Sequence, residues 1–376
     1  MEEEDWTAGV RDSVRFWILH VCTPIVVAIG LAGNGVTILV LSRKRMKSST
    51  NIYLIALAAA DLFFLFFTLF LSLWHVEAFK SPSFLPLWKT WGTIMWMTDA
   101  CTVMSIWMTV SFTLERYIAV CHPLRGKVLC TESRARKVVC SVVIMAMVIT
   151  STTPFEWTGV LVEKNNVTTA KVIPTPLQNN ATYVFIFHNL WTFILVVVPF
   201  TLLLVLNSLL INAVRRSQRY RNTLTEDSRG VQGSIRRVKM SSSDEDINRG
   251  SWRAGGARKF NRERQENKIT MALVSVVCLF LICQAPTAVV LTIKLFYHPP
   301  HGSPKENILL AVNNVCNLLV QINATANFIL YCAMSDKYRE TLFLIFCPTY
   351  RHKRNNTYSS VASFRNSTHV TQFEHT

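Results

Sequence analysis

Long apolar runs alternate with short polar or basic links along most of the chain. Few charged residues interrupt these runs. The length of each run is close to or above the roughly 20 residues that a helix needs to cross a bilayer. The runs lie at 15–41, 51–75, 92–120, 138–156, 183–213, 270–296 and 307–333. This pattern predicts an all-α fold, a bundle of seven transmembrane helices.

The segments between and after these runs predict the domain organisation. Residues 1–14 precede the first span, 15–348 form the transmembrane domain, and 349–376 form a tail rich in Ser, Thr and Asn. The stretch of about 217–265 is too polar to bury a core, so it is expected to be a disordered loop. Ser335 to Phe346 has the spacing of a short amphipathic helix on the membrane surface. Cys347 follows it, as a candidate for palmitoylation or a plain free thiol.

Basic residues predict the orientation of the spans. The links 42–50, 121–137 and 214–269 and the tail are rich in Lys and Arg, whereas the links near 76–91, 157–182 and 297–306 are not. Because basic loops stay in the cytoplasm, the N-terminus is expected outside the plasma membrane and the C-terminus inside. The sequons at Asn166 and Asn180 lie in the longest outer link and are the predicted glycosylation sites.

Composition argues against several other classes of protein. The chain is 50% hydrophobic and only 16% charged, against roughly 25% charged for a soluble domain. Its net charge of +16 would suggest nucleic acid in a soluble protein, but the basic residues lie in the links and the tail, so no nucleic acid is expected. No enzyme is expected either, since the catalytic motifs H-E-x-x-H and G-x-S-x-G and phosphate-binding glycine motifs are absent. A transporter remains as an alternative, although no repeated halves are visible.

Polar residues at similar depths in several spans predict an internal cluster. A charge in mid-membrane costs at least ~2.5 kcal/mol unless it is sheltered, and Asp61 lies in the middle of the second span. One carboxylate and several neutral oxygens suit a hydrated Na⁺, which makes Asp61 a candidate metal ligand. A hydrogen-bond network without an ion is the alternative. The expected members of the cluster are Asn34, Asp61, Ser105, Asn323 and Asn327.

A charged tripeptide ends the third span. In Glu115-Arg116-Tyr117 the adjacent charges can pair, and Arg116 is also expected to reach Glu266 at the foot of the sixth span. Such a pair would hold two helices together until another partner competes for Arg116, which makes a two-state element. Simple anchoring of Arg116 at the headgroups is the alternative. Pro199 and Pro286 lie inside the fifth and sixth spans and are expected to bend them.

In order and spacing, these motifs resemble those of the rhodopsin-like G-protein-coupled receptors along nearly the whole chain. The matching pieces are Gly33-Asn34, Leu57-Ala58-Ala59-Ala60-Asp61, Glu115-Arg116-Tyr117, Cys283-Gln284-Ala285-Pro286 and Asn327-Phe328-Ile329-Leu330-Tyr331. The resemblance implies that Arg116 engages a heterotrimeric G protein, with Glu266 as its partner in the inactive state. It also implies that Tyr331 is a switch residue and that a receptor kinase and arrestin act on the tail.

The chain departs from the family's pattern at defined positions. Trp91 stands where the family has the cysteine that joins the third helix to an outer loop, and the 157–182 loop has no cysteine. The ten cysteines lie in apolar runs or basic segments, so no extracellular disulfide framework is expected. Gln284 replaces a tryptophan expected to act as a switch, and Phe328 replaces a proline.

The resemblance also suggests the kind of ligand. Val205-Leu206-Asn207 and the residues after Met334 resemble receptors for the FMRFamide, myosuppressin and myoinhibitory neuropeptides. Lys47-Ser48-Ser49 resembles orphan receptors proposed to sense aromatic amino acids, so a small molecule is the alternative to a short peptide.

The ligand is expected between the outer halves of the helices. Asp99 lies one residue past Thr98, the position that resembles the ammonium-binding aspartate of amine receptors. One residue turns a helical side chain by ~100°, which argues against an amine ligand at this position. Asp99 and Glu77 are candidates to bind a peptide's arginine or amino terminus instead, and an internal hydrogen bond of Asp99 is the alternative. Packing or interfacial anchoring is the alternative for each aromatic residue. The remaining candidates are Trp96, His188, Trp191, Gln284, Asn317 and Gln321.

Overall fold

The computed structural model describes residues 6–213 apart from 165, then 215–216, and 274–347 apart from 276, 295, 298 and 301. The predicted loop at about 217–265, the tail at 349–376 and Glu266 lie outside the described residues. The side chain of His188 lies outside them as well.

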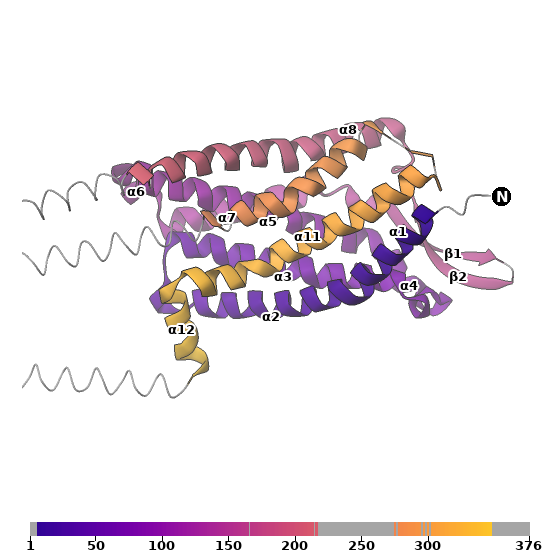
Figure 1. The fold of residues 1–376 in the computed structure, drawn as a ribbon, viewed down its shortest axis with the longest axis horizontal. Coiled ribbons are helices and arrows are strands. Elements are labelled where there is room, and N and C mark those ends of the chain that lie inside the picture. Colours follow the sequence, from indigo (N-terminus) through magenta and orange to yellow (C-terminus); the bar gives the residue numbers. More distant parts are fainter. Residues whose placement is uncertain are drawn as a thin grey trace, which may run out of the picture.

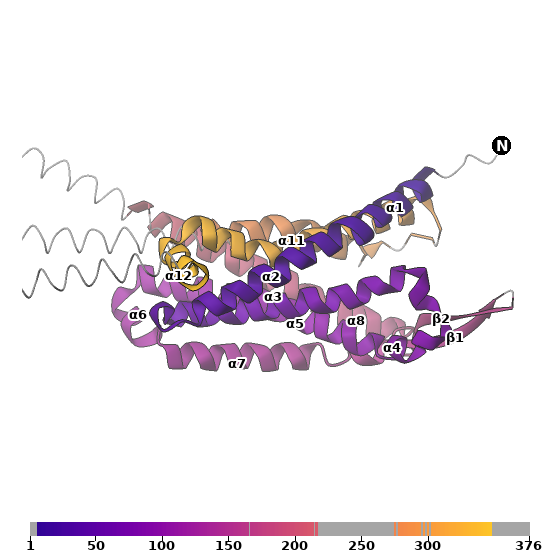
Figure 2. The same ribbon diagram turned by 90° about the horizontal axis from the view of Figure 1, so that it is seen from below.

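The described chain forms a bundle of long helices, and the prediction of an all-α seven-helix bundle is confirmed (Figures 1 and 2). Six helical segments are long and apolar enough to cross a membrane: Trp6–Leu41, Ser49–His75, Glu132–Phe155, Ala181–Ala213, Val277–Lys294 and Pro304–Ala333. The other long helix is α5, Trp91–Cys121, with 31 residues. It is less apolar because polar residues such as Ser105, Thr109 and Thr113 are buried against neighbouring helices, where lipid does not reach them.

The first helix starts earlier than the apolar run indicated. It consists of α1 (Trp6–Phe16), a π-helical segment at Trp17–Cys22 and α2 (Thr23–Leu41). Part of the segment 1–14, expected to lie before the first span, is therefore helical. The fifth span also has a π-helical segment, Phe193–Val197, between α8 (Ala181–Thr192) and Pro199. A proline has no backbone N–H and therefore removes one helical hydrogen bond. Each of the two π-helical segments lies just before a proline.

Side-chain caps define where several helices begin. α3 (Ser49–Ser72), α7 (Glu132–Ile149), α11 (Pro304–Met334) and α12 (Asp336–Phe346) are each preceded by a Ser or Thr. The hydroxyl oxygen of each cap accepts a hydrogen bond from the backbone N–H three residues later, which satisfies one free donor of the first turn. α7 ends at Ile149, earlier than the predicted span of 138–156, and a 3₁₀ turn at Thr153–Phe155 follows.

The two ends of the bundle are built differently (Figure 1). At one end, the short helix α6 (Pro123–Leu129) follows α5, and α12 turns away from the axis of α11. At the other end lie the N-terminal helix, the short helix α4 (Leu85–Lys89) and an antiparallel hairpin. These are called the α12 end and the hairpin end below.

The hairpin was not predicted from the sequence. Its strands β1 (Trp157–Lys164) and β2 (Val167–Pro174) pair with Trp157 opposite Pro174 and Lys164 opposite Val167. Asn166 in the turn has φ 59°, a left-handed conformation that asparagine tolerates better than most residues. The 157–182 link is therefore an ordered element in the described part of the chain.

Large apolar side chains also cover the outside of the bundle. Ile144, Val148 and Ile282 are each more than 60% exposed. Soluble proteins rarely expose apolar patches of this extent, whereas lipid covers them in a membrane. This surface and the lengths of the helices agree in describing a multi-pass membrane protein.

Candidate functional site

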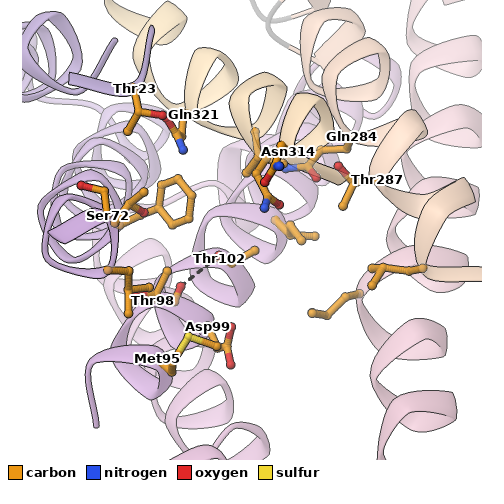
Figure 3. A pocket seen from close by; sticks show the side chains of 18 of the residues that line it. Thr23, Ser72, Met95, Thr98, Asp99, Thr102, Gln284, Thr287, Asn314 and Gln321 are labelled. Carbon is orange, nitrogen blue, oxygen red and sulfur yellow. Dashed lines mark hydrogen bonds between the residues drawn. The ribbon is translucent and has the colours of Figure 1, made fainter. Parts of the chain in front are cut away.

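A large cavity of about 400 Å³ opens among the helices toward the hairpin end. Its volume is in the range typical of small-molecule and cofactor sites. Figure 3 shows Thr98, Asp99 and Thr102 of α5 on one side of it, across from Gln284, Thr287, Asn314 and Gln321. Most of its surface is apolar, with polar groups at a few places, as in pockets that orient a ligand by a few directional contacts.

The large cavity contains most of the residues predicted to bind ligand. The lining includes Asp99, Trp191, Gln284, Asn317 and Gln321. Thr98 and Asp99 both line it, so the turn of one residue between them does not remove Asp99 from the cavity.

Two predicted ligand residues are not in this lining. Glu77 lies on a 3₁₀ turn, where its side chain is 85% exposed and pairs with Lys80. Its carboxylate therefore faces away from the site that the sequence suggested for it. Trp96 is half-buried on α5, but it is not among the residues that line the cavity.

Several lining residues were not predicted from the sequence. Thr68, Ser72 and His75 of the second span line the cavity, and their spacing of four and three residues places them on one helical face. Thr23 of α2 and Thr102 of α5 line it too. Polar positions at helical spacing within an apolar run would have identified this face.

A compact polar cluster lies deeper in the bundle. Asp61 of α3 is 1% exposed. One carboxylate oxygen accepts a hydrogen bond from Ser105 Oγ at 2.8 Å, and the other accepts one from Asn327 Nδ2 at 2.7 Å. These bonds connect α3 with α5 and α11. A small cavity of about 10 Å³ adjoins the cluster, lined in part by Asp61, Ser105 and Asn323.

Asn34 belongs to a different contact from the one that the sequence suggested. Its Nδ2 donates hydrogen bonds to the backbone oxygens of Gly30 at 3.0 Å and Ala324 at 2.9 Å. It does not line the small cavity. Asn34 therefore joins α2 to α11, because an amide N–H can donate to a backbone carbonyl as well as to a carboxylate.

The large and small cavities share part of their walls. Phe64, Thr102, Gln284 and Val320 line both. Gln284 is 9% exposed. It occupies the position where the rhodopsin-like receptors usually have a tryptophan. A movement of the Gln284 side chain in the large cavity therefore also changes the shape of the small cavity beside Asp61.

At the α12 end, Glu115 connects α3 and α5. Its Oε1 accepts hydrogen bonds from Ser49 Oγ at 2.8 Å and Thr50 Oγ1 at 2.9 Å, and from Arg116 Nη2 at 3.0 Å. Tyr117 packs edge-on against His122, with ring centroids 5.8 Å apart. Glu266, the other predicted partner of Arg116, lies outside the described residues. The two hydroxyls on Glu115 were not predicted.

Tyr331 is buried at the junction of α11 and α12. Its ring centroid lies 5.9 Å from that of Tyr338, and its hydroxyl has no hydrogen-bond partner among the described residues. Thr37 Oγ1 donates to the Gly33 carbonyl, so the Tyr338 hydroxyl donates to Thr37 over 3.2 Å. Burial raises the pKa of Tyr338 to about 12, so this hydroxyl remains a donor at physiological pH.

The outer loop is held without a disulfide. All ten cysteines lie in the described residues and are free. Trp74, Trp88 and Trp91 form an aromatic cluster instead, with ring centroids 5.0 to 5.8 Å apart. Trp88 is 0% exposed, and its Nε1 donates to the Phe79 carbonyl at 2.7 Å. Trp91, which replaces the expected cysteine, is thus part of a packed alternative.

The remaining predicted residues have clear positions. The helix of Val277–Lys294 runs through Pro286. Asn166 and Asn180 are both exposed at the hairpin end. Asn180 caps α8 through its Oδ1, 3.1 Å from the Tyr183 N–H, which leaves its Nδ2 free for a sugar. Cys347 follows α12 directly and is half-buried. Within the described part of the chain, no group of three or more His, Cys, Asp or Glu side chains could hold a metal ion.

Comparison with known proteins gives the same family along most of the chain. Residues 33–331 match the model of the 7 transmembrane receptor (rhodopsin family). The FMRFamide receptor of Drosophila melanogaster is 26% identical over 89% of this chain and 55% of its own length, so the chain spans about half of that relative. The sex peptide receptor of the same organism is 25% identical over 93% of this chain and 78% of its own length. The thyrotropin-releasing hormone receptor of Gallus gallus is 25% identical over 90% and 81%. The chain belongs to the rhodopsin family of seven-transmembrane receptors.

Proposed function

We propose that this receptor binds a short peptide at the hairpin end and activates a heterotrimeric G protein at the α12 end. The observation that carries the proposal is the large cavity, which is open to the hairpin end and shares a wall with the polar cluster around Asp61. Relatives named for FMRFamide and for the sex peptide support a peptide as the ligand. The basic links support an N-terminus outside the plasma membrane and a C-terminus in the cytoplasm.

Signal transfer follows from the shared wall. A ligand group that displaces Gln284 or Thr102 also reshapes the small cavity, because both residues line it. Asp61 holds Ser105 of α5 and Asn327 of α11, so this change alters how three helices pack. Packed cores switch between discrete arrangements more readily than they deform continuously. The second arrangement frees Arg116 for the G protein.

The Asp61 cluster also fits a sodium ion. A carboxylate, a hydroxyl and an amide oxygen are hard donors of the kind that alkali cations prefer, and Asp61, Ser105 and Asn323 offer them around the small cavity. Its volume of about 10 Å³ is close to that of one water-sized sphere. When bound, Na⁺ would supply the positive charge that balances Asp61. Asp61 and its two hydrogen-bond donors would then hold α3, α5 and α11 in the inactive arrangement.

Regulation is proposed at the cytoplasmic tail. Ser359, Ser360, Ser363, Ser367 and Thr368 lie in the segment after the bundle, outside the described residues. Phosphorylation by a receptor kinase would add strong acceptor groups and negative charge to this basic protein, and arrestin would then bind. A palmitoyl chain on Cys347 and sugars on Asn166 and Asn180 complete the expected modifications.

A ligand screen tests the proposal. Cells that express the full chain would be exposed to amidated neuropeptides and to free aromatic amino acids, with G-protein activation as the readout. A nanomolar response to a peptide is expected. A response only to millimolar amino acids would favour a small-molecule sensor. Nucleotide exchange on the G protein also separates a receptor from a transporter, which would move a solute without it.

A further inference from the structure

Asp99 is poorly satisfied for a carboxylate that lines a cavity inside a helix bundle. Among the described residues its one hydrogen-bond donor is Thr153 Oγ1, at 3.3 Å from Oδ2. Asp61, by comparison, receives two donors at 2.8 and 2.7 Å. An ionised carboxylate has about four acceptor positions. Asp99 therefore has unused acceptor capacity on the wall of the large cavity.

A second carboxylate lies behind Asp99. Glu156 is 7% exposed, and its backbone N–H donates to the carbonyl of Thr153 at 3.2 Å. Thr153 is the same residue whose hydroxyl contacts Asp99, and the charge of Glu156 acts on Asp99. Two acidic groups thus flank one threonine, next to the large cavity. Glu156 was not predicted from the sequence to bind ligand.

An aromatic column holds Glu156 in place. Tyr183 Oη donates to Glu156 Oε1 at 2.6 Å. The ring of Tyr183 stacks on Phe187 with centroids 5.4 Å apart, and Phe187 stacks on Trp191 at 5.6 Å. Trp191 lines the large cavity. The position of Glu156 is therefore tied to the same helix that forms part of the cavity wall.

The ion pairs among the described residues include neither acid. Three cations of the hairpin end have other partners: Lys294 donates to Asn313, Arg15 to His75, and Lys80 pairs with Glu77. Buried acidic groups are stable when a cation pairs with them. Within the described part of the chain, that cation is not supplied by the protein.

We infer that Asp99 and Glu156 form a subsite for a basic group of the ligand, such as a guanidinium, with Asp99 in contact and Glu156 as the second charge behind it. A guanidinium offers paired N–H donors that match a carboxylate. The inference rests on the proposed function, since it concerns the same cavity. It replaces Glu77 with Glu156 as the second acid of the ligand site.

The test uses a probe that does not require the natural ligand. N-acetyl-arginine amide and N-acetyl-citrulline amide differ in that a neutral urea replaces the guanidinium. Each would be titrated into the purified full-length receptor while its melting temperature is followed. The wild type is expected to bind the arginine probe roughly tenfold or more tightly than the citrulline probe, the difference expected of a charge-assisted hydrogen bond.

Three variants separate the role of each acid. Asp99→Asn keeps the shape of the side chain and is expected to abolish the preference for arginine. Glu156→Gln is expected to reduce it severalfold, because Glu156 contributes charge without contact. Glu163→Gln changes an exposed carboxylate on β1 and is expected to leave the preference unchanged. The melting temperature without probe reports whether each variant folds.

The inference is overturned if both probes bind equally, if neither stabilises the wild type, or if the preference survives in Asp99→Asn or is unchanged in Glu156→Gln. These outcomes differ from failure of the proposed function. A receptor that prefers the arginine probe but never promotes nucleotide exchange with any peptide would retain the subsite and lose the peptide-receptor proposal.

Discussion

Gly159 of β1 lies directly against the backbone of Trp88 in α4: a Cβ at position 159 would be 2.5 Å from the Trp88 carbonyl carbon. Gly92 of α5 makes a similar close approach to the carbonyl of Pro154. The hairpin therefore rests on the bundle through positions where only glycine fits. Together with the tryptophan cluster, these contacts hold the outer loop, for which most rhodopsin-like receptors use a disulfide.

The first prediction concerns this docking contact. Gly159→Ala places a methyl group too close to the backbone of Trp88. We therefore expect the free energy of unfolding of the receptor to fall by about 1–3 kcal/mol, as is typical of overpacked sites. Thermal unfolding of the purified receptor measures the effect. Gly35→Ala is the matched control, because a Cβ there meets nothing within 4 Å. Equal melting temperatures for Gly159→Ala and the control would show that the hairpin is not held at this point.

The second prediction concerns the contact between α3 and α5. Glu115→Gln removes the charge that Ser49, Thr50 and Arg116 share. Hydrogen bonds to charged groups contribute about 1.5–3 kcal/mol, roughly twice the value for neutral pairs. Arg116 is then held less firmly, so we expect basal nucleotide exchange on the G protein to rise severalfold.

Glu132→Gln serves as the control for this experiment. Glu132 forms an exposed i, i+4 pair with Arg136, a type of pair that contributes only about 0.3–0.5 kcal/mol. Basal exchange should stay at the wild-type level in this variant. The predicted clamp to Glu266 has its own test, since Glu266→Ala should also raise basal exchange. If basal exchange is unchanged in both Glu115→Gln and Glu266→Ala, neither acid restrains Arg116.

The third prediction concerns sodium. When NaCl is replaced by choline chloride at constant ionic strength, we expect the melting temperature of the wild type to fall. At a concentration tenfold above Kd, a bound ion stabilises the folded state by about 1.4 kcal/mol. Asp61→Asn should remove this difference, whereas Asp12→Asn, at an exposed acid paired with Arg11, should keep it. A wild type that melts identically in both salts argues for a hydrogen-bond network without an ion.

The fourth prediction concerns the wall between the cavities. Gln284→Leu should change both the ligand response and the sodium dependence of stability, because Gln284 lines both cavities. Thr287→Val should change only the ligand response, since Thr287 lines the large cavity alone. The two readouts are measured on the same preparations. If Gln284→Leu alters one readout and leaves the other at the wild-type value, the shared wall does not couple the sites.

The helices and the deep polar cluster were predictable because both depend on local properties. The length of an apolar run predicts a span, and the cost of a charge in hydrocarbon indicates that Asp61 needs partners. Ser105 and Asn327 lie at matching depths, and the structure brings both to Asp61. Helix ends were less predictable, since α1 begins at Trp6 within a stretch that contains charges.

The contacts at the hairpin end depend on tertiary structure and were not predictable in the same way. The approach of Gly159 to Trp88 joins segments far apart in sequence, and neither residue signals it locally. The sequence predicted Glu77 as a ligand residue, yet its side chain lies on a 3₁₀ turn and is exposed to solvent. Glu156 follows the turn at Thr153–Phe155, and Thr153 of this turn contacts Asp99; no sequence pattern indicated the turn.

Peptide-stimulated nucleotide exchange in a reconstituted system tests the central claim most directly. The purified receptor would be placed in lipid nanodiscs with a heterotrimeric G protein, and exchange would be followed with and without the peptide found in the cell screen. The account predicts that nanomolar peptide accelerates exchange in the wild type and fails to do so in Arg116→Ala, although the peptide still binds. Peptide binding without any acceleration in the wild type, or acceleration that persists in Arg116→Ala, would contradict it.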